Sequence, residues 1–280
     1  MNKKPKGKLI IIGGHENKTD DRQILETVAK QVIGGPLVVI TVATQSPQAM
    51  ADEYLKVFHD LGLKHVEILD IRTREDAKNQ TNVEICAKAS VLFFTGGDQL
   101  RITSQVGDSP LYQCMMDNYC KGATIVGTSA GAAAMPETML ISGPSDESNR
   151  ISALNMAPGL ALIQGVVIDS HFAERGRMGR LLGAVAQNPR NLGIGIDEDT
   201  AIIVERAEGF TVIGSGAVYV VDGSTVTYSS LSEKNPENIL SLYDTKLHVL
   251  GDGDCFEFAN RRPFIAENIK REVEARSAGK

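Results

Sequence analysis

The chain has 280 residues and a formal net charge of −6, with 42% hydrophobic and 23% charged residues. This balance is typical of a globular protein with a substantial core. The acidic charge and the lack of a long lysine or arginine run argue against a nucleic-acid-binding protein. No apolar run has the length of a membrane span, and the one after the basic N-terminus is too short for a secretory signal. We therefore expect a cytoplasmic protein that binds neither nucleic acid nor membrane.

No motif indicates a metal or a cofactor. The four cysteines have no C-x-x-C spacing, and no neighbouring histidine completes a zinc pattern. Gly13-Gly14-His15-Glu16 matches neither the dinucleotide fingerprint nor the P-loop. We expect free thiols, no metal site and no cofactor.

Short β-branched runs alternate with helical periods over the first part of the chain. The runs are apolar at consecutive positions, which is typical of strands buried on both faces of a parallel sheet. The predicted strands are Lys8–Gly13, Leu37–Thr44, His65–Asp70, Ser90–Gly96 and Ala123–Gly127, and the predicted helices are Asp20–Ile33, Pro47–Leu61, Asn82–Ala89 and Pro110–Cys120. This alternation predicts an α/β fold, with a doubly wound, mostly parallel sheet flanked by helices. No boundary divides residues 1–280 into more than one domain.

The second half continues less regularly. Further strands are expected at Val166–Ile168 and Leu192–Ile196, with a helix between them at Met178–Gln187. Closely spaced strands at Ala201–Glu205, Phe210–Ile213 and Ala217–Val221 predict an antiparallel meander at the sheet edge. Ser142–Asn149 and Ser229–Asn238 are expected to be polar loops, and the tail from Pro263 a charged surface helix.

Gly127-Thr128-Ser129-Ala130-Gly131 is the most informative stretch of the sequence. It follows a predicted strand and runs into three alanines that favour a helix. Strand, tight turn and helix form the context of a nucleophile elbow, in which Ser129 would stand on a strained turn. The amide of Ala130 at the helix start could donate to an oxyanion. Gly97 ends another strand of the same sheet, and its amide could complete the oxyanion hole.

A seryl nucleophile needs a general base, which is usually a histidine. His171 follows the predicted strand Val166–Ile168 and emerges at the strand edge that carries Ser129, so it is the first candidate. His15, also at a strand end, is the reserve candidate. The acid that orients the base should come from Asp197-Glu198-Asp199, after the next strand; Glu198 is preferred and Asp197 is second. The order Ser, His, Glu differs from that of α/β-hydrolases.

Three arginines, Arg175, Arg177 and Arg180, follow the predicted base. Arginine binds carboxylates through paired hydrogen bonds, so this cluster indicates a substrate with carboxylate groups. Surface solubility is the alternative explanation.

Four segments together resemble cyanophycinase, within the serine peptidase family that also includes α-aspartyl dipeptidase. They are the elbow, Thr-Gly-Gly-Asp-Gln at 95–99, the segment Asp169–Arg180 with its spaced arginines, and Gly-Ile-Gly-Ile-Asp-Glu-Asp-Thr-Ala at 193–201. The resemblance extends from Lys8 to the end of the predicted meander. The arginine-spaced segment is its most specific part, because the shorter dipeptidases lack it.

The resemblance implies a class I glutamine amidotransferase-like fold, a homodimer, and a serine exopeptidase that degrades cyanophycin to β-Asp-Arg dipeptides. By position, Ser129, His171 and Glu198 would be catalytic, and Gly97 and Ala130 would form the oxyanion hole. The substrate pocket would consist of Gln99, Asp169, Ser170, Arg175, Arg177 and Arg180. Ser170 departs from the glutamine of the best-known members, which leaves one pocket contact open. A dipeptidase for Asp-X or isoaspartyl peptides and a non-catalytic binding protein are the alternatives.

Overall fold

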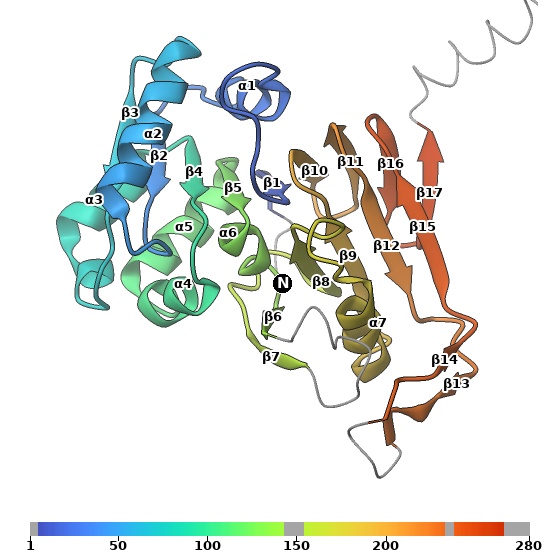
Figure 1. Cartoon of the computed structure of the whole chain (residues 1–280). Helices are drawn as coiled ribbons and strands as arrows, with labels where there is room; N and C mark the ends of the chain where they lie inside the picture. The colour runs from blue at the N-terminus through green and yellow to red at the C-terminus, as the bar shows by residue number, and fades with distance from the viewer. Residues whose placement is uncertain (1–4, 143–153, 233–237, 266–280) are drawn as a thin grey trace, which may run out of the picture.

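The computed structural model describes residues 5–142, 154–232 and 238–265. Its largest sheet has nine strands in the order β17-β16-β11-β10-β1-β5-β4-β2-β3 (Figure 1). Five of them are parallel to one another: β1 (Lys8–Ile12), β2 (Leu37–Ile40), β3 (Val66–Leu69), β4 (Val91–Phe94) and β5 (Thr124–Thr128). All five strands predicted in the first part of the chain are thus present in a large, parallel-rich sheet flanked by helices.

Both faces of this parallel region are covered, because apolar residues occupy successive positions. In β1, Leu9 and Ile11 pack in one hydrophobic cluster, while Ile10 and Ile12 pack in the other. The second cluster lies against α1 (Gln23–Ala29) and α2 (Pro47–Asp60). The first lies against the helices α3 (Gln80–Lys88), α4 (Gln99–Val106), α5 (Pro110–Lys121) and α6 (Ala130–Ala133). None of the helices in the described ranges is both long and apolar enough to cross a bilayer.

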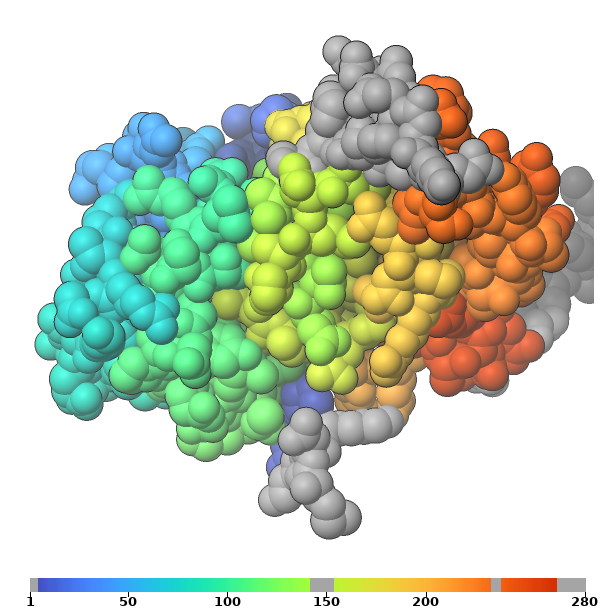
Figure 2. All heavy atoms as spheres, turned by 90° about the horizontal axis from the view of Figure 1, so that it is seen from below, coloured from blue at the N-terminus to red at the C-terminus, as the bar shows by residue number. Residues whose placement is uncertain are grey.

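Antiparallel strands extend the sheet beyond β1. They are β10 (Thr200–Glu205), β11 (Gly209–Gly214), β16 (Asp254–Glu257) and β17 (Arg262–Ile265). The predicted antiparallel extension is therefore present. In the space-filling view of Figure 2, these orange and red strands lie at the opposite end of the molecule from the cyan and green helices.

A second sheet, in the order β15-β12-β9-β8, packs on the same face as α3 to α6. Its strands are β8 (Val166–Ser170), β9 (Leu192–Ile196), β12 (Val218–Asp222) and β15 (Lys246–Leu250). The helix α7 (Met178–Gln187) covers its other face through a third cluster that includes Leu181 and Val185. In two further small sheets, β6 (Thr138–Ser142) pairs antiparallel with β7 (Asn155–Pro158), and β13 (Tyr228–Ser229) pairs antiparallel with β14 (Leu242–Tyr243).

The second sheet corrects two expectations. β8 and β9 do not continue the main sheet, and β12 pairs with β9 rather than with β11, so the predicted meander ends after two strands. The physical reason is burial. Val220 packs in the main core while Val221 packs under α7, and a strand that is apolar on both sides belongs inside a layer rather than at a sheet edge.

Some sequence expectations fall elsewhere. The predicted tail helix is wrong at its start, because Pro263 to Ile265 lie in strand β17. Residues 266–280 are outside the described residues, as is most of the predicted loop Ser142–Asn149. The second predicted loop begins in β13 and a short 3-10 helix, Ser230–Ser232, before it leaves the described range. The helix α4 was not predicted, although Asp98 caps it by accepting from the amide of Leu100 at 2.9 Å.

Candidate active site

Ser129 stands between β5 and α6 in a strained backbone conformation, with φ 54° and ψ −110°. Its amide donates to the carbonyl of Ile12 at 3.1 Å, which ties the turn to the end of the neighbouring strand β1. The flanking glycines permit the close approach that the turn requires. A Cβ on Gly127 would lie 2.5 Å from the backbone of Gly131, and one on Gly131 would lie 2.5 Å from the carbonyl oxygen of Phe94. The geometry is that of a nucleophile elbow.

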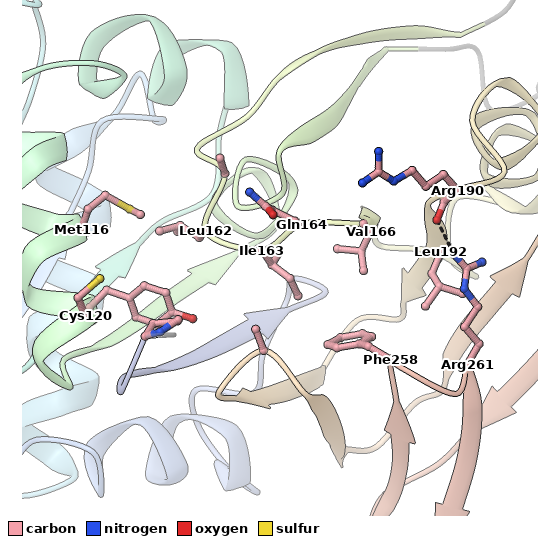
Figure 3. A pocket seen from close by; sticks show the side chains of 15 residues that line it. Met116, Cys120, Leu162, Ile163, Gln164, Val166, Arg190, Leu192, Phe258 and Arg261 are labelled. Atoms are coloured by element: carbon pink, nitrogen blue, oxygen red, sulfur yellow. Dashed lines mark hydrogen bonds between the residues drawn. The ribbon is translucent and has the colours of Figure 1, made fainter. Parts of the chain in front are cut away.

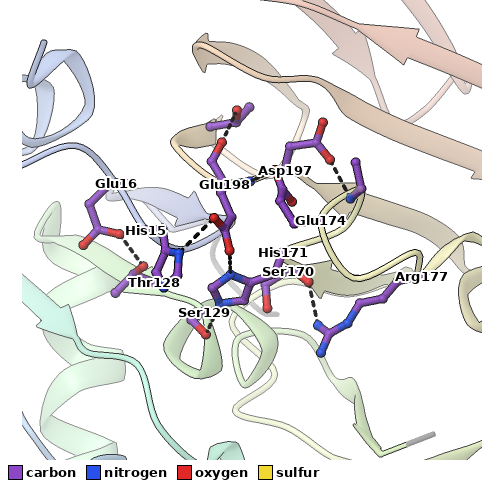
Figure 4. A network of polar contacts seen from close by, with 12 residues as sticks. His15, Glu16, Thr128, Ser129, Ser170, His171, Glu174, Arg177, Asp197 and Glu198 are labelled. Atoms are coloured by element: carbon purple, nitrogen blue, oxygen red, sulfur yellow. Dashed lines mark hydrogen bonds and ion pairs between the residues drawn. The ribbon is translucent and has the colours of Figure 1, made fainter. Parts of the chain in front are cut away.

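Three side chains form one hydrogen-bonded chain at this turn (Figure 4). Ser129 Oγ lies 2.8 Å from His171 Nε2, and His171 Nδ1 lies 2.6 Å from Glu198 Oε1. His171 directly follows β8, and Glu198 follows the parallel neighbour β9, so both come from the second sheet. The carboxyl ends of strands from two sheets therefore meet at Ser129.

The structure distinguishes the two acids that the sequence left open. Asp197 is 7% exposed and accepts from the amides of Ala173 at 2.9 Å and Ala217 at 3.1 Å. It therefore binds the backbone and holds the turn after His171 against the start of β12. Glu198 is the acid that contacts the imidazole.

Burial lowers the pKa of His171 below its ordinary value of 6.5, and the positive charges of Arg175 and His15 act in the same direction. The hydrogen bond and negative charge of Glu198 oppose this effect without cancelling it. Burial by itself raises the pKa of Glu198, but hydrogen bonds from His171 and His15 outweigh it, so that pKa is lowered overall. His171 is thus held neutral and Glu198 ionised, which are the states that a general base and its orienting acid need.

The loop after β1 supports both His171 and Glu198. A Cβ on Gly14, whose φ is +109°, would lie 2.3 Å from Cε1 of His171, so only glycine fits beneath the imidazole. The amide of His171 donates to the carbonyl of Gly13 at 2.8 Å. His15 Nδ1 lies 2.8 Å from the second oxygen of Glu198. The sequence placed this loop at a strand end and kept His15 as a reserve base, but did not predict its contact with the acid.

Glu16 is a second residue of this loop that the sequence did not single out. It is 3% exposed, and its carboxylate accepts from the hydroxyl of Thr128 at 2.6 Å and from that of Tyr54. Burial raises the pKa of Tyr54 well above its ordinary value, and the negative charge and hydrogen bond of Glu16 act in the same direction. Thr128 precedes Ser129, so Glu16 fixes the elbow from the side of α2. The available signal in the sequence was a glutamate two residues after a glycine pair at the end of a predicted strand.

Gly97 and Ala130, the residues predicted to form the oxyanion hole, directly follow Gly96 and Ser129 in the sequence. Gly96 and Ser129 are neighbours, since a Cβ on Gly96 would lie 3.4 Å from that of Ser129. Gly97 has φ +143°, and Ala130 is the first residue of α6. Among the described residues, neither amide donates a hydrogen bond. Both remain available to a developing oxyanion.

The predicted substrate residues fall into two groups. Asp169 and Arg180 are buried against each other, with contacts of 2.6 Å and 2.5 Å, and Arg177 adds a contact of 3.0 Å to the same carboxylate. The guanidinium of Arg180 therefore has little freedom to bind a substrate. Arg175 is exposed. Its amide donates to the carbonyl of His171 at 3.1 Å, but its guanidinium makes no hydrogen bond or ion pair within the described part of the chain.

Gln99 and Ser170 are engaged by the backbone. The side-chain amide of Gln99 donates to the carbonyls of Leu140 at 2.8 Å and Ile141 at 3.2 Å. The carbonyl of Ser170 accepts from Arg177 at 2.6 Å, while Ser170 itself is 5% exposed. The contact of Ser170 joins the end of β8 to the turn that carries the arginines, whereas those of Gln99 join α4 to β6.

A cavity of about 880 Å³ lies away from this site, near the start of β8 and β9 (Figure 3). Apolar side chains that include Met116, Leu162 and Phe258 line it, together with Arg190 and Arg261. None of the lining residues belongs to the Ser129 chain. This cavity and the Ser129–His171–Glu198 site are therefore separate.

His15, His171 and Glu198 are the described residues that come closest to a metal-ligand set, with ligand atoms within 4.8 Å of one another. Their nitrogen–oxygen separations of 2.6 Å and 2.8 Å are those of hydrogen bonds. Two ligands of a tetrahedral zinc ion lie about 3.3 Å apart. The cluster fits proton sharing better than metal binding.

Comparison with known proteins agrees with this geometry. Residues 9–212 match the model of peptidase family S51. The chain is 37% identical over 259 residues to a cyanophycinase of Geminocystis herdmanii, covering 91% of this chain and 95% of that one. It is 38% identical over 260 residues to a cyanophycinase of Trichormus variabilis, covering 90% and 86%. A crystal structure of a peptidase from an acI-B1 actinobacterium superposes with a TM-score of 0.70 at 20% sequence identity. The superposition covers 91% of this chain and 98% of that peptidase, and it supports the fold. The chain belongs to peptidase family S51.

Proposed function

We propose that this protein is a cyanophycinase, a serine exopeptidase that hydrolyses cyanophycin to β-Asp-Arg dipeptides. The observation that carries the proposal is the chain Ser129–His171–Glu198, with contacts of 2.8 Å and 2.6 Å at a strained elbow. The identity of 37% to cyanophycinases over nine-tenths of the chain supports the substrate.

The reaction is acyl transfer through a covalent intermediate. Ser129 Oγ attacks an aspartyl carbonyl carbon, and His171 Nε2 accepts the hydroxyl proton. Glu198 keeps the imidazole oriented and stabilises its positive charge. The amides of Gly97 and Ala130 bind the oxyanion. His171 then protonates the leaving amine, and a water molecule, deprotonated by His171, releases the acyl group and restores Ser129.

The charged residues suit a substrate that carries both carboxylates and guanidinium groups. Arg175 is exposed beside the base and is the best-placed cation for a substrate carboxylate. Asp169, Arg177 and Arg180 form a buried network below it. Their role in this proposal is to hold the arginine-bearing turn in shape, with Arg177 half-buried at its rim. Gln99 and Ser170 complete the pocket wall.

The finer features expected from the sequence complete the proposal. We infer a homodimer in the cytoplasm, with the sheet arrangement of class I glutamine amidotransferases and with no cofactor. The mild negative charge of −6 suits a substrate rich in arginine and disfavours nucleic acid as a partner. Sedimentation equilibrium of the purified protein measures the oligomeric state directly.

Incubation with insoluble cyanophycin tests the substrate. We expect solubilisation and release of β-Asp-Arg dipeptides by the native protein and none by the variant Ser129→Ala. Turnover of free Asp-X or isoaspartyl dipeptides without solubilisation would establish the dipeptidase alternative. A native protein that is folded but is not labelled by a fluorophosphonate would be a binding protein, and the hydrolase proposal would fail.

A further inference from the structure

His15 places a second imidazole on the acid of the catalytic chain. Its Nδ1 lies 2.8 Å from Glu198 Oε2, while the other oxygen of the same carboxylate lies 2.6 Å from His171 Nδ1 (Figure 4). The rings of His15 and His171 meet edge to face, with centroids 5.1 Å apart. Glu198 is thus held from both of its oxygens.

This contact differs from an ordinary surface ion pair. The side chain of His15 is 71% exposed, and exposed pairs usually contribute little because two flexible side chains must be ordered. Here the backbone segments that carry His15 and Glu198 are already bound to each other. The amide of Gly13 donates to Thr200, and that of Asp199 donates to Gly14, each at 2.9 Å. The side chains of His15 and Glu198 therefore make their contact from two backbone segments that hydrogen bonds hold together.

A third hydrogen bond joins the same two backbone segments. The amide of Asn17 donates to the carboxylate of Asp199 at 2.8 Å, so the loop is bound to the 197–200 turn on both sides of His15. His15 itself has φ 45°, in the left-handed region that a non-glycine residue adopts only when the structure requires it. From this conformation the ring reaches the carboxylate of Glu198 (Figure 4).

We propose that His15 is a positioning residue, which holds the Glu198 carboxylate in the orientation that keeps His171 aimed at Ser129. Glu198 is 25% exposed on its side chain, so without His15 its second oxygen would turn towards water. The role rests on the proposed acyl transfer, in which a misdirected imidazole slows the chemical step and leaves substrate binding unchanged.

Two substitutions and one control separate positioning from general damage. His15→Ala removes the donor. His15→Asn keeps one, because asparagine places an amide nitrogen near the position of Nδ1 and tolerates the left-handed region. The control His65→Ala removes an exposed histidine just before β3, away from the site.

We expect His15→Ala to lower kcat on cyanophycin about fivefold, which corresponds to about 1 kcal/mol. The KM should stay unchanged, and the rate of fluorophosphonate labelling should fall by the same factor. His15→Asn should recover most of the loss, and His65→Ala should match the native protein. Native kcat in His15→Ala, or a loss that appears in KM, would overturn the proposal.

The pH profile of labelling gives a second readout. The titratable and charged groups facing His171 are Glu198, His15 and Arg175, besides the Ser129 hydroxyl. Removing His15 deletes a group whose positive charge lowers the pKa of His171. The acid limb of the profile should therefore move to higher pH in both His15 variants. An unmoved limb would argue against the contact.

Proton NMR distinguishes failure of this inference from failure of the proposed function. The His171 Nδ1 proton, which bonds Glu198, should give a downfield signal whether or not cyanophycin is the substrate. It should be sharp in the native protein and in His15→Asn, and broadened by exchange with water in His15→Ala. An equally sharp signal in His15→Ala would refute the positioning role, even if the enzyme is active.

Discussion

Replacing Gly14 with alanine perturbs the site without removing any catalytic group. The added Cβ would lie 2.3 Å from Cε1 and 2.6 Å from Nε2 of His171, whereas carbon atoms in contact lie about 3.5–4.0 Å apart. The imidazole must therefore retreat by about 1 Å, which opens its 2.8 Å contact with Ser129. A misplacement of this size costs on the order of 10²-fold in rate.

The rate of Ser129 labelling by a fluorophosphonate measures this effect independently of any substrate. We expect a decrease of about 10²-fold in Gly14→Ala. Alanine at φ +109° also strains the backbone by about 1–3 kcal/mol, which a denaturation curve measures. The loss of labelling should persist under conditions in which the variant is fully folded.

Gly122→Ala is the matched control. Gly122 has φ +127°, but a Cβ there would meet nothing within 4 Å. Its backbone strain should therefore be similar, while its labelling rate should equal that of the native protein. Native labelling in folded Gly14→Ala would refute the reasoning, and so would an equal loss in Gly122→Ala.

Three further predictions concern the acids and the base. Burial lowers the pKa of His171 below 6.5, so the imidazole binds a proton more tightly in the unfolded chain than in the folded protein. The contribution of His171 to the free energy of unfolding is therefore fully present above about pH 6.5. It is lost as the pH falls through the pKa of the folded state. The labelling rate should also stay on its plateau below pH 6.5, and a midpoint above 6.5 would contradict this. Glu198→Gln should lower kcat on the order of 10⁴-fold with little change in stability, because Glu198 orients the imidazole. Asp197→Ala should instead lower the free energy of unfolding by about 1–2 kcal/mol in a urea titration, because Asp197 binds backbone amides. The opposite pattern would show that the two acids have exchanged roles. Arg180→Leu leaves the 1% exposed Asp169 with Arg177 as its only arginine partner and should destabilise the fold by about 3 kcal/mol, so an unchanged urea midpoint would show that the pair is not buried in solution.

The amino-acid sequence by itself determined the parallel strands and the elbow. Consecutive Ile and Val residues, as in Lys8–Ile12, are enough to predict a strand buried on both faces, because burial on both sides leaves no alternation. Gly127 to Gly131 predicted the turn, since its sharpness requires small residues at fixed positions. His171 and an acid from Asp197-Glu198-Asp199 were predicted from their places after strands, with Glu198 preferred and Asp197 second.

Only the tertiary structure decided which sheet each later strand joins. The apolar residues of β12 indicate a buried strand but not the sheet that it joins, and its place beside β9 depends on apolar partners that are distant in sequence. Likewise, Asp197 and Glu198 are adjacent acids, and the backbone amides of Ala173 and Ala217 decide which of them is left for the imidazole. The contact between His15 and Glu198 spans 183 residues, so no local signal could have predicted it. Local propensity thus determines the elements, whereas long-range burial and hydrogen bonding determine how they meet.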